Sequence, residues 1–120
     1  MTSAHPERLD DGTRSAERVA TVGDVPEGEV RVVTCGDREL ALSNVDGALY
    51  AIDNVCTHDG GPLGEGRLRG NRVICPRHGA AFDARTGRVL TLPAVRSVRA
   101  YPVTTDGDEV FVDIEAGKLP

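Results

Sequence analysis

Two short segments of the chain each carry one cysteine and one histidine at a spacing that suits metal binding. Cys56 and His58 belong to the first segment, and Cys75 and His78 belong to the second. A site with two thiolates and two imidazoles fits either a tetrahedral zinc ion or a diiron cluster. Side chains of these types can also be ordinary buried thiols and hydrogen-bonded histidines.

The order of the four residues separates these alternatives. A structural zinc site usually takes a close pair of cysteines from one segment and a pair of histidines from another. Here each segment supplies one of each. This interleaving favours a two-iron site, in which each loop gives a thiolate to one iron and an imidazole to the other, and a structural zinc module remains the weaker alternative.

The pattern C-x-H-x16-C-x2-H resembles the signature of the Rieske [2Fe–2S] proteins. Gly60 and Pro62 follow the first pair of residues, and Gly79 follows the second. Further along, Phe82-Asp83, Thr86-Gly87 and Pro93-Ala94 are similar to the corresponding stretch of Rieske ferredoxins of the bacterial aromatic-ring-hydroxylating dioxygenase type. The resemblance covers residues 18–115.

The resemblance implies one [2Fe–2S] cluster as the cofactor and no catalytic residue. It assigns Cys56 and Cys75 to a buried inner iron. It assigns His58 and His78 to an outer iron, each through the ring nitrogen nearer the backbone. The far edges of the two imidazoles then face solvent and provide the exit for the electron.

A chain of this family is expected to be an electron carrier and not an enzyme. It would take electrons from an NAD(P)H-dependent, flavin-containing ferredoxin reductase and pass them to a terminal non-haem iron oxygenase. We expect docking near His58, His78, Pro62, Leu63 and Pro93. The alternative is a small Rieske-like subunit of nitrite reductase.

The chain itself lacks the residues of an oxygenase catalytic subunit. The mononuclear iron of such a subunit requires two more histidines and a carboxylate, and His5 is the one histidine outside the two segments. Because His5 lies in a polar stretch, we expect it to be solvated.

Four glycines in and after the two segments allow two interpretations. Gly60, Gly61, Gly64 and Gly79 could bring the loop backbone close to the cluster and direct N–H groups at its sulfides. Alternatively, they merely permit turns.

The remaining sequence predicts an all-β domain. Short β-branched runs alternate with turn residues, and Asp46-Gly47, Gly70-Asn71 and Asp106-Gly107 are typical of hairpin turns. We therefore expect an antiparallel sandwich or barrel, to which the resemblance adds a small cluster-binding subdomain made of the two ligand loops. The expected strands are Val19–Val22, Val30–Thr34, Leu40–Val45, Leu49–Ile52, Arg72–Ile74, Ser97–Thr104 and Glu109–Ile114.

A chain of 120 residues suits one domain. We expect a flexible N-terminal extension over residues 1–17, the Rieske domain over residues 18–115 and a C-terminal tail over residues 116–120. Three cysteines do not suit a disulfide framework, and Cys35 is expected to be a buried structural thiol. No apolar run is long enough to cross a bilayer, so a cytoplasmic location and no membrane partner are expected.

The net charge of −5 disfavours a nucleic-acid partner. It mainly indicates solubility, and the lesser interpretation is electrostatic steering towards a basic partner.

The resemblance also predicts the reduction potential. High-potential respiratory relatives carry a cysteine in each ligand loop where this chain has Gly61 and Arg77, and hydroxyl donors where it has Ala80 and Phe82. Without those donors the reduced cluster is less stabilised, whereas Arg77 opposes this effect to a small extent. We predict a potential of about −150 mV rather than about +300 mV, measured by protein-film voltammetry, and a clearly positive value at neutral pH would refute this.

Overall fold

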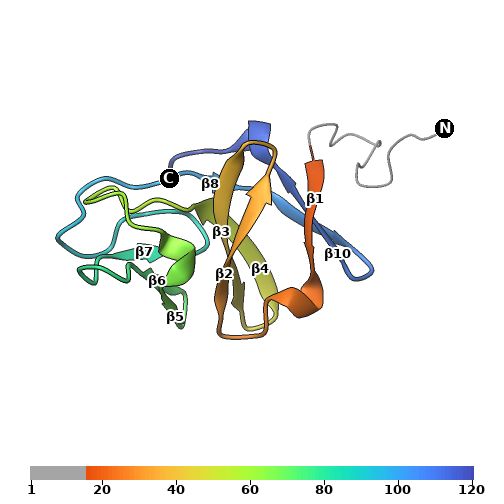
Figure 1. Ribbon diagram of the computed structural model, residues 1–120, viewed down its shortest axis with the longest axis horizontal. Helices are drawn as coiled ribbons and strands as arrows, with labels where there is room; N and C mark the ends of the chain where they lie inside the picture. Colours follow the sequence, from red (N-terminus) through yellow and green to blue (C-terminus); the bar gives the residue numbers. More distant parts are fainter. Residues whose placement is uncertain (1–15) are drawn as a thin grey trace.

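The computed structural model describes residues 16–120, and in this part of the chain ten strands form three antiparallel sheets (Figure 1). The sheets have the orders β1-β10-β9, β2-β3-β4-β8 and β5-β6-β7. The all-β prediction is therefore confirmed. The strands are β1 (Ala16–Thr21), β2 (Val30–Cys35), β3 (Arg38–Val45), β4 (Ala48–Asp53), β5 (Arg67–Arg69), β6 (Arg72–Ile74), β7 (Ala81–Asp83), β8 (Ala100–Tyr101), β9 (Val103–Asp106) and β10 (Glu109–Asp113), with short 3-10 helices η1 (Val22–Asp24), η2 (Leu63–Glu65) and η3 (Ile114–Ala116).

One hydrophobic core lies between the first two sheets. Leu40 and Leu42 of β3 face Val110 and Val112 of β10, and all four are fully buried. Successive side chains of a strand point to opposite faces, so alternate residues of β3 and β10 meet in this core.

Cys35, at the end of β2, lies in the same core at 1% exposure, as predicted. Burial raises the pKa of its thiol to about 11, so it is protonated at neutral pH.

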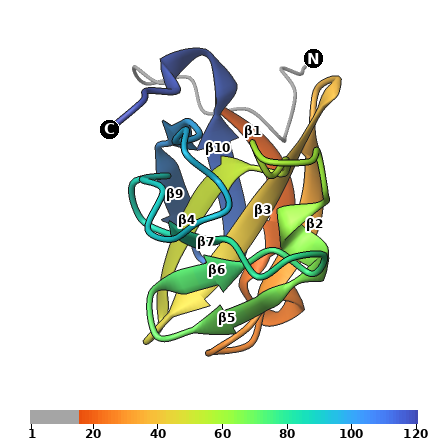
Figure 2. The ribbon, with the colours of Figure 1, turned by 90° about the vertical axis from the view of Figure 1, so that its left-hand side faces the viewer.

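A second core fills the space between the sheet β2-β3-β4-β8 and the sheet β5-β6-β7. Ala41 of β3 and Ile52 of β4 point into it from one side, and Val73 and Phe82 point into it from the other. Leu63 of η2 is buried among them at 0% exposure. Figure 2 shows β5, β6 and β7 in front of the larger sheets. This arrangement gives the small sheet a rigid base.

The predicted strand Ser97–Thr104 is wrong as a single strand. Tyr101 of β8 pairs with Ala51 in one sheet, and β9 pairs with β10 in another. Pro102 lies between the two short strands and has no N–H for a ladder bond. Residues 97–99 instead belong to a loop, in which Ser97 Oγ accepts the N–H of Val89 at 3.0 Å.

The ends of the predicted domain are ordered further than the expected boundaries. Ala16 and Glu17 already pair with β10 as part of β1, while residues 1–15, and His5 with them, lie outside the described residues. Near the C-terminus Lys118 and Ala100 exchange two backbone hydrogen bonds of 2.9 Å. Within residues 16–120 no helix has the length and apolar character needed to cross a membrane.

The burial of Leu63 leads to a stability prediction. Leu63→Ala should lower the free energy of unfolding by about 2–5 kcal/mol, because it leaves a cavity under the first ligand loop. The matched control is Leu92→Ala, at a side chain that is 75% exposed, which should change it by less than about 0.5 kcal/mol. Urea unfolding followed by circular dichroism measures both, and equal costs would contradict the placement of Leu63.

Candidate metal centre

The two cysteine-histidine segments form neighbouring loops at one end of the molecule. Cys56 follows β4 after two residues, and the second loop joins β6 to β7, with Cys75 directly after β6. β6 and β7 are adjacent antiparallel strands whose register pairs Ile74 with Ala81. The second loop is therefore the tip of a hairpin that rests on the second core.

Each loop is closed by the same two backbone hydrogen bonds. In the first loop the Gly60 N–H donates to the Cys56 carbonyl at 2.7 Å, and the Cys56 N–H donates to the Gly61 carbonyl at 2.8 Å. In the second loop Gly79 donates to Cys75 at 3.2 Å, and Cys75 donates to the Ala80 carbonyl at 2.8 Å. The two loops thus hold their cysteines in equivalent positions.

Gly60 and Gly79 close these loops in the left-handed region, with φ of 77° and 79°. Residues with a Cβ rarely adopt this conformation. The N–H groups of all four glycines have protein acceptors, since Gly61 donates to Asp59 Oδ1 at 2.9 Å and Gly64 to Asn54 Oδ1 at 2.6 Å. These acceptors and the positive φ of Gly60 and Gly79 favour the turn interpretation for those two residues. The contact of any of these N–H groups with a sulfide stays a prediction.

The structure brings the four predicted residues together and separates them by burial. Cys56 and Cys75 are 1% and 2% exposed, and their Sγ atoms lie within 4.8 Å of each other. His58 and His78 are exposed, and their rings meet edge to face with centroids 5.4 Å apart. The thiols form an inner pair and the imidazoles an outer pair.

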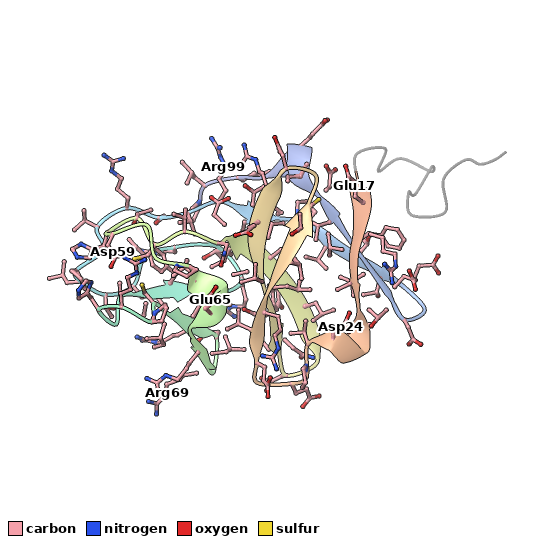
Figure 3. All side chains as sticks on the ribbon, viewed as in Figure 1. Glu17, Asp24, Asp59, Glu65, Arg69 and Arg99 are labelled. Carbon is pink, nitrogen blue, oxygen red and sulfur yellow. The ribbon has the colours of Figure 1, made fainter. Side chains whose placement is uncertain are left out.

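Asp59 is a site residue that the sequence analysis missed. Its Oδ2 lies 2.9 Å from His78 Nδ1 and its Oδ1 4.0 Å from Cys75 Sγ, so the carboxylate contacts one member of each pair. Figure 3 shows Asp59 at the end of the molecule opposite β1. The N–H of Gly61 is the main cause that lowers the pKa of Asp59, and His78 adds to it. An acidic residue directly after the first histidine was the signal available in the sequence.

A third loop, which lies between β7 and β8 and contains Pro93 and Arg96, is hydrogen-bonded to the first ligand loop. Thr57 Oγ1 donates to the Arg96 carbonyl at 2.6 Å. Pro93 of this loop is half-buried, as is Pro62 of the first, whereas Leu92 and Val95 are each 75% exposed.

The predicted position of Leu63 on the docking surface is wrong. Leu63 begins η2, which packs against β2 and turns this side chain into the second core. The most exposed large apolar side chains among residues 55–99 are instead those of Leu92 and Val95, each 75% exposed.

The two positions at which high-potential relatives are expected to carry cysteines lie side by side. A Cβ at Gly61 would lie 3.2 Å from Arg77 Cδ and Nε. The side chain of Arg77 therefore covers the backbone of the first loop at this point. Ala80 and Phe82, which replace the hydroxyl donors, are both 0% exposed.

The donor set fits an iron–sulfur centre with mixed ligands. Two buried thiols and two exposed imidazoles come from paired loops, and sulfur and nitrogen donors are those that such a centre requires. Burial raises the pKa of the Cys56 thiol, so its thiolate form depends on a nearby cation. The fold and site thus define an antiparallel β-protein with a candidate metal centre between two cysteine-histidine loops.

Comparison with known proteins identifies the family. Residues 15–102 match the model of the Rieske [2Fe-2S] domain. The ferredoxin component of the naphthalene 1,2-dioxygenase system of Pseudomonas aeruginosa is 42% identical over 91 residues, which are 76% of this chain and 88% of the relative. The Sphingomonas yanoikuyae B1 ferredoxin superposes with a TM-score of 0.76 at 36% identity, over 80% of this chain and 95% of that one.

A further similar structure is the complex of reduced oxygenase and oxidized ferredoxin in carbazole 1,9a-dioxygenase. The match has a TM-score of 0.79 at 32% identity and covers 88% of this chain and 98% of that chain. The chain belongs to the Rieske [2Fe–2S] family. Its cofactor is one [2Fe–2S] cluster, and it is an electron carrier of the ferredoxin type, as expected from the sequence.

Asn54 is the residue whose removal tests how the first loop is held. Asn54→Ala leaves the Gly64 N–H without its acceptor and should cost about 1–3 kcal/mol of unfolding free energy. The cluster should also be lost faster to a chelator. Glu39→Ala, which removes the exposed second partner of Asn54 at 3.4 Å, is the control and should be nearly neutral. Identical chelator half-lives for both variants would show that Asn54 does not hold the loop.

Proposed function

We propose that Cys56 and Cys75 bind the inner iron of the cluster and that His58 and His78 bind the outer iron through Nδ1. The observation that carries this proposal is the separation of a buried thiol pair from an exposed imidazole pair. The equivalent closure of the two loops supports it, because each loop then gives one thiolate and one imidazole. Cys35 lies in the other core and is not a ligand.

Asp59 has a defined place in this proposal. His78 Nδ1 cannot bind iron and hydrogen-bond to Asp59 Oδ2 at the same time, because both interactions use the same lone pair or proton position. The Asp59 side chain therefore turns away from His78 when that nitrogen is a ligand. The Asp59 Oδ1 contact with the Gly61 N–H gives the carboxylate a second anchor.

We further propose that the chain delivers single electrons to a terminal non-haem iron oxygenase after receiving them from a flavin-containing reductase. The [2Fe–2S] cluster supplies one-electron exchange. The exposed edges of His58 and His78 form the contact surface for both partners, flanked by Pro62 and Pro93. The similar ferredoxin bound to the oxygenase of carbazole 1,9a-dioxygenase supports the oxygenase as one partner.

The low potential remains part of the proposal. Ala80 and Phe82 are fully buried beside the second ligand loop and offer no hydroxyl hydrogen bond. The relatives named above are ferredoxin components of dioxygenase systems, which favours the carrier over a nitrite reductase subunit. Rapid reduction by a separate reductase would support the carrier, whereas co-purification with a large haem-containing subunit would contradict it.

The ligand assignment predicts the behaviour of three matched variants. Cys56→Ser and Cys75→Ser should each abolish the cluster, because a ligand of the inner iron is lost. Cys35→Ser removes the third free thiol and should leave two iron and two sulfide per chain. Iron and sulfide analysis after anaerobic purification measures all three. Normal iron in either ligand variant, or colourless wild-type protein with stoichiometric zinc, would refute the assignment.

A further inference from the structure

The charges of this chain are divided between its two ends. Residues 55–99, which contain the ligand loops, carry eight arginines against three acidic residues, a formal excess of five positive charges. Residues 16–54 and 100–120 together carry four basic and thirteen acidic residues, a formal excess of nine negative charges. The acidity of the whole molecule therefore hides a basic end.

The acidic residues of the basic end do little to reduce its positive surface charge. Asp83 is buried and forms an ion pair with Arg85 at 3.1 Å. Asp59 is only partly exposed, which leaves Glu65 as the exposed acid among the described residues 55–99. All eight arginines are exposed, and within residues 16–120 Arg85 is the one among them with an ion pair.

Several arginines border the ligand loops directly. Arg67 lines a hollow of about 430 Å³ together with Cys75, Pro76 and Gly79 of the second loop. Arg77 belongs to that loop, and the Arg96 carbonyl accepts the Thr57 hydroxyl of the first loop. We call Arg67, Arg77 and Arg96 the basic rim.

The hairpin β5-β6 adds two exposed arginines, Arg69 and Arg72, to the positive charge near the ligand loops. Arg69 and Arg72 are directly opposite each other in the register, an arrangement that costs stability for like charges. Arg67 and Arg69 lie on the same face of β5, while Leu68 between them packs against the second core. Figure 3 shows Arg69 pointing away from the small sheet, at a distance from Glu17 and Asp24 near β1.

We propose that the basic rim docks an acidic protein surface around the exposed histidines. This inference rests on the proposed function and adds the charge of the partner. Leu92 and Val95, each 75% exposed, give the same end an apolar contact that suits a protein interface with a charged margin. A phosphate backbone would not use these side chains.

The local charge governs the approach of a partner at physiological salt. The Debye length is about 8 Å at 0.15 M ionic strength, so the acidic strands near β1 are screened from the ligand loops. The net charge of −5 predicts steering towards a basic partner. The basic rim instead predicts steering towards an acidic partner.

Two inorganic oxidants measure this sign without any protein partner. The reduced holoprotein is mixed with ferricyanide, an anion, and separately with hexaammineruthenium(III), a cation, from about 0.1 to about 0.5 M KCl. We expect the rate with the anion to fall at least about twofold and the rate with the cation to rise. The reverse slopes would overturn the proposal and would leave the electron-carrier function intact.

Matched variants locate the effect. Arg67→Gln and Arg96→Gln should each reduce the salt dependence with ferricyanide. Arg18→Gln makes the same change in net charge in β1, at the far end of the molecule, and should leave the salt dependence unchanged. Equal effects of all three variants would overturn the proposal.

Binding of a polymer tests the class of partner. Labelled poly-L-glutamate should bind the holoprotein, as measured by fluorescence anisotropy, and Arg67→Gln should weaken this binding several-fold more than Arg18→Gln. Preference for poly-L-lysine, or tighter binding of a labelled DNA duplex than of polyglutamate, would overturn the assignment to an acidic protein surface.

Discussion

The closed backbone of the two ligand loops is the constraint on which the site depends. The carbonyl of each cysteine accepts a hydrogen bond from the N–H of the glycine four residues later. The N–H of each cysteine donates to the carbonyl of the residue that follows this glycine. These bonds satisfy the main chain at the cysteine and fix the direction of its side chain. Because the two loops close in the same way, the two thiols meet as an inner pair without any contribution from a disulfide or helix.

The loops need a rigid base, and the second hydrophobic core provides it. Leu63 and Phe82 are fully buried beneath the loops, in the same cluster as Cys56 and Cys75. The interior ends at the thiols, and the histidines project beyond it. A centre that must exchange electrons at the surface while remaining dry on its inner side is therefore built at the edge of a core, and not within a pocket.

The sequence was sufficient for the family and the fold class, because the spacing of the cysteines and histidines and the hairpin turns are local signals. The assignment of the four ligands stays a prediction. It was insufficient where a position depends on packing between distant segments. The sequence predicted Leu63 on the surface of a loop, but η2 directs its side chain into the second core. Asp59 contacts His78 nineteen residues away. The excess of arginines in residues 55–99 can be counted in the sequence, but the fold is needed to place Arg67 beside the second ligand loop. The net charge of −5 mainly indicated solubility, and only its lesser interpretation was steering towards a basic partner.

The central claim, that two histidines and two cysteines hold the cluster, is tested most directly by pulsed electron paramagnetic resonance of the dithionite-reduced protein. Samples with natural and 15N-labelled histidine are compared. The account predicts couplings from two ligand nitrogens that change on labelling in a spectrum of a reduced [2Fe–2S] centre. A cluster spectrum that is insensitive to histidine labelling would contradict the account.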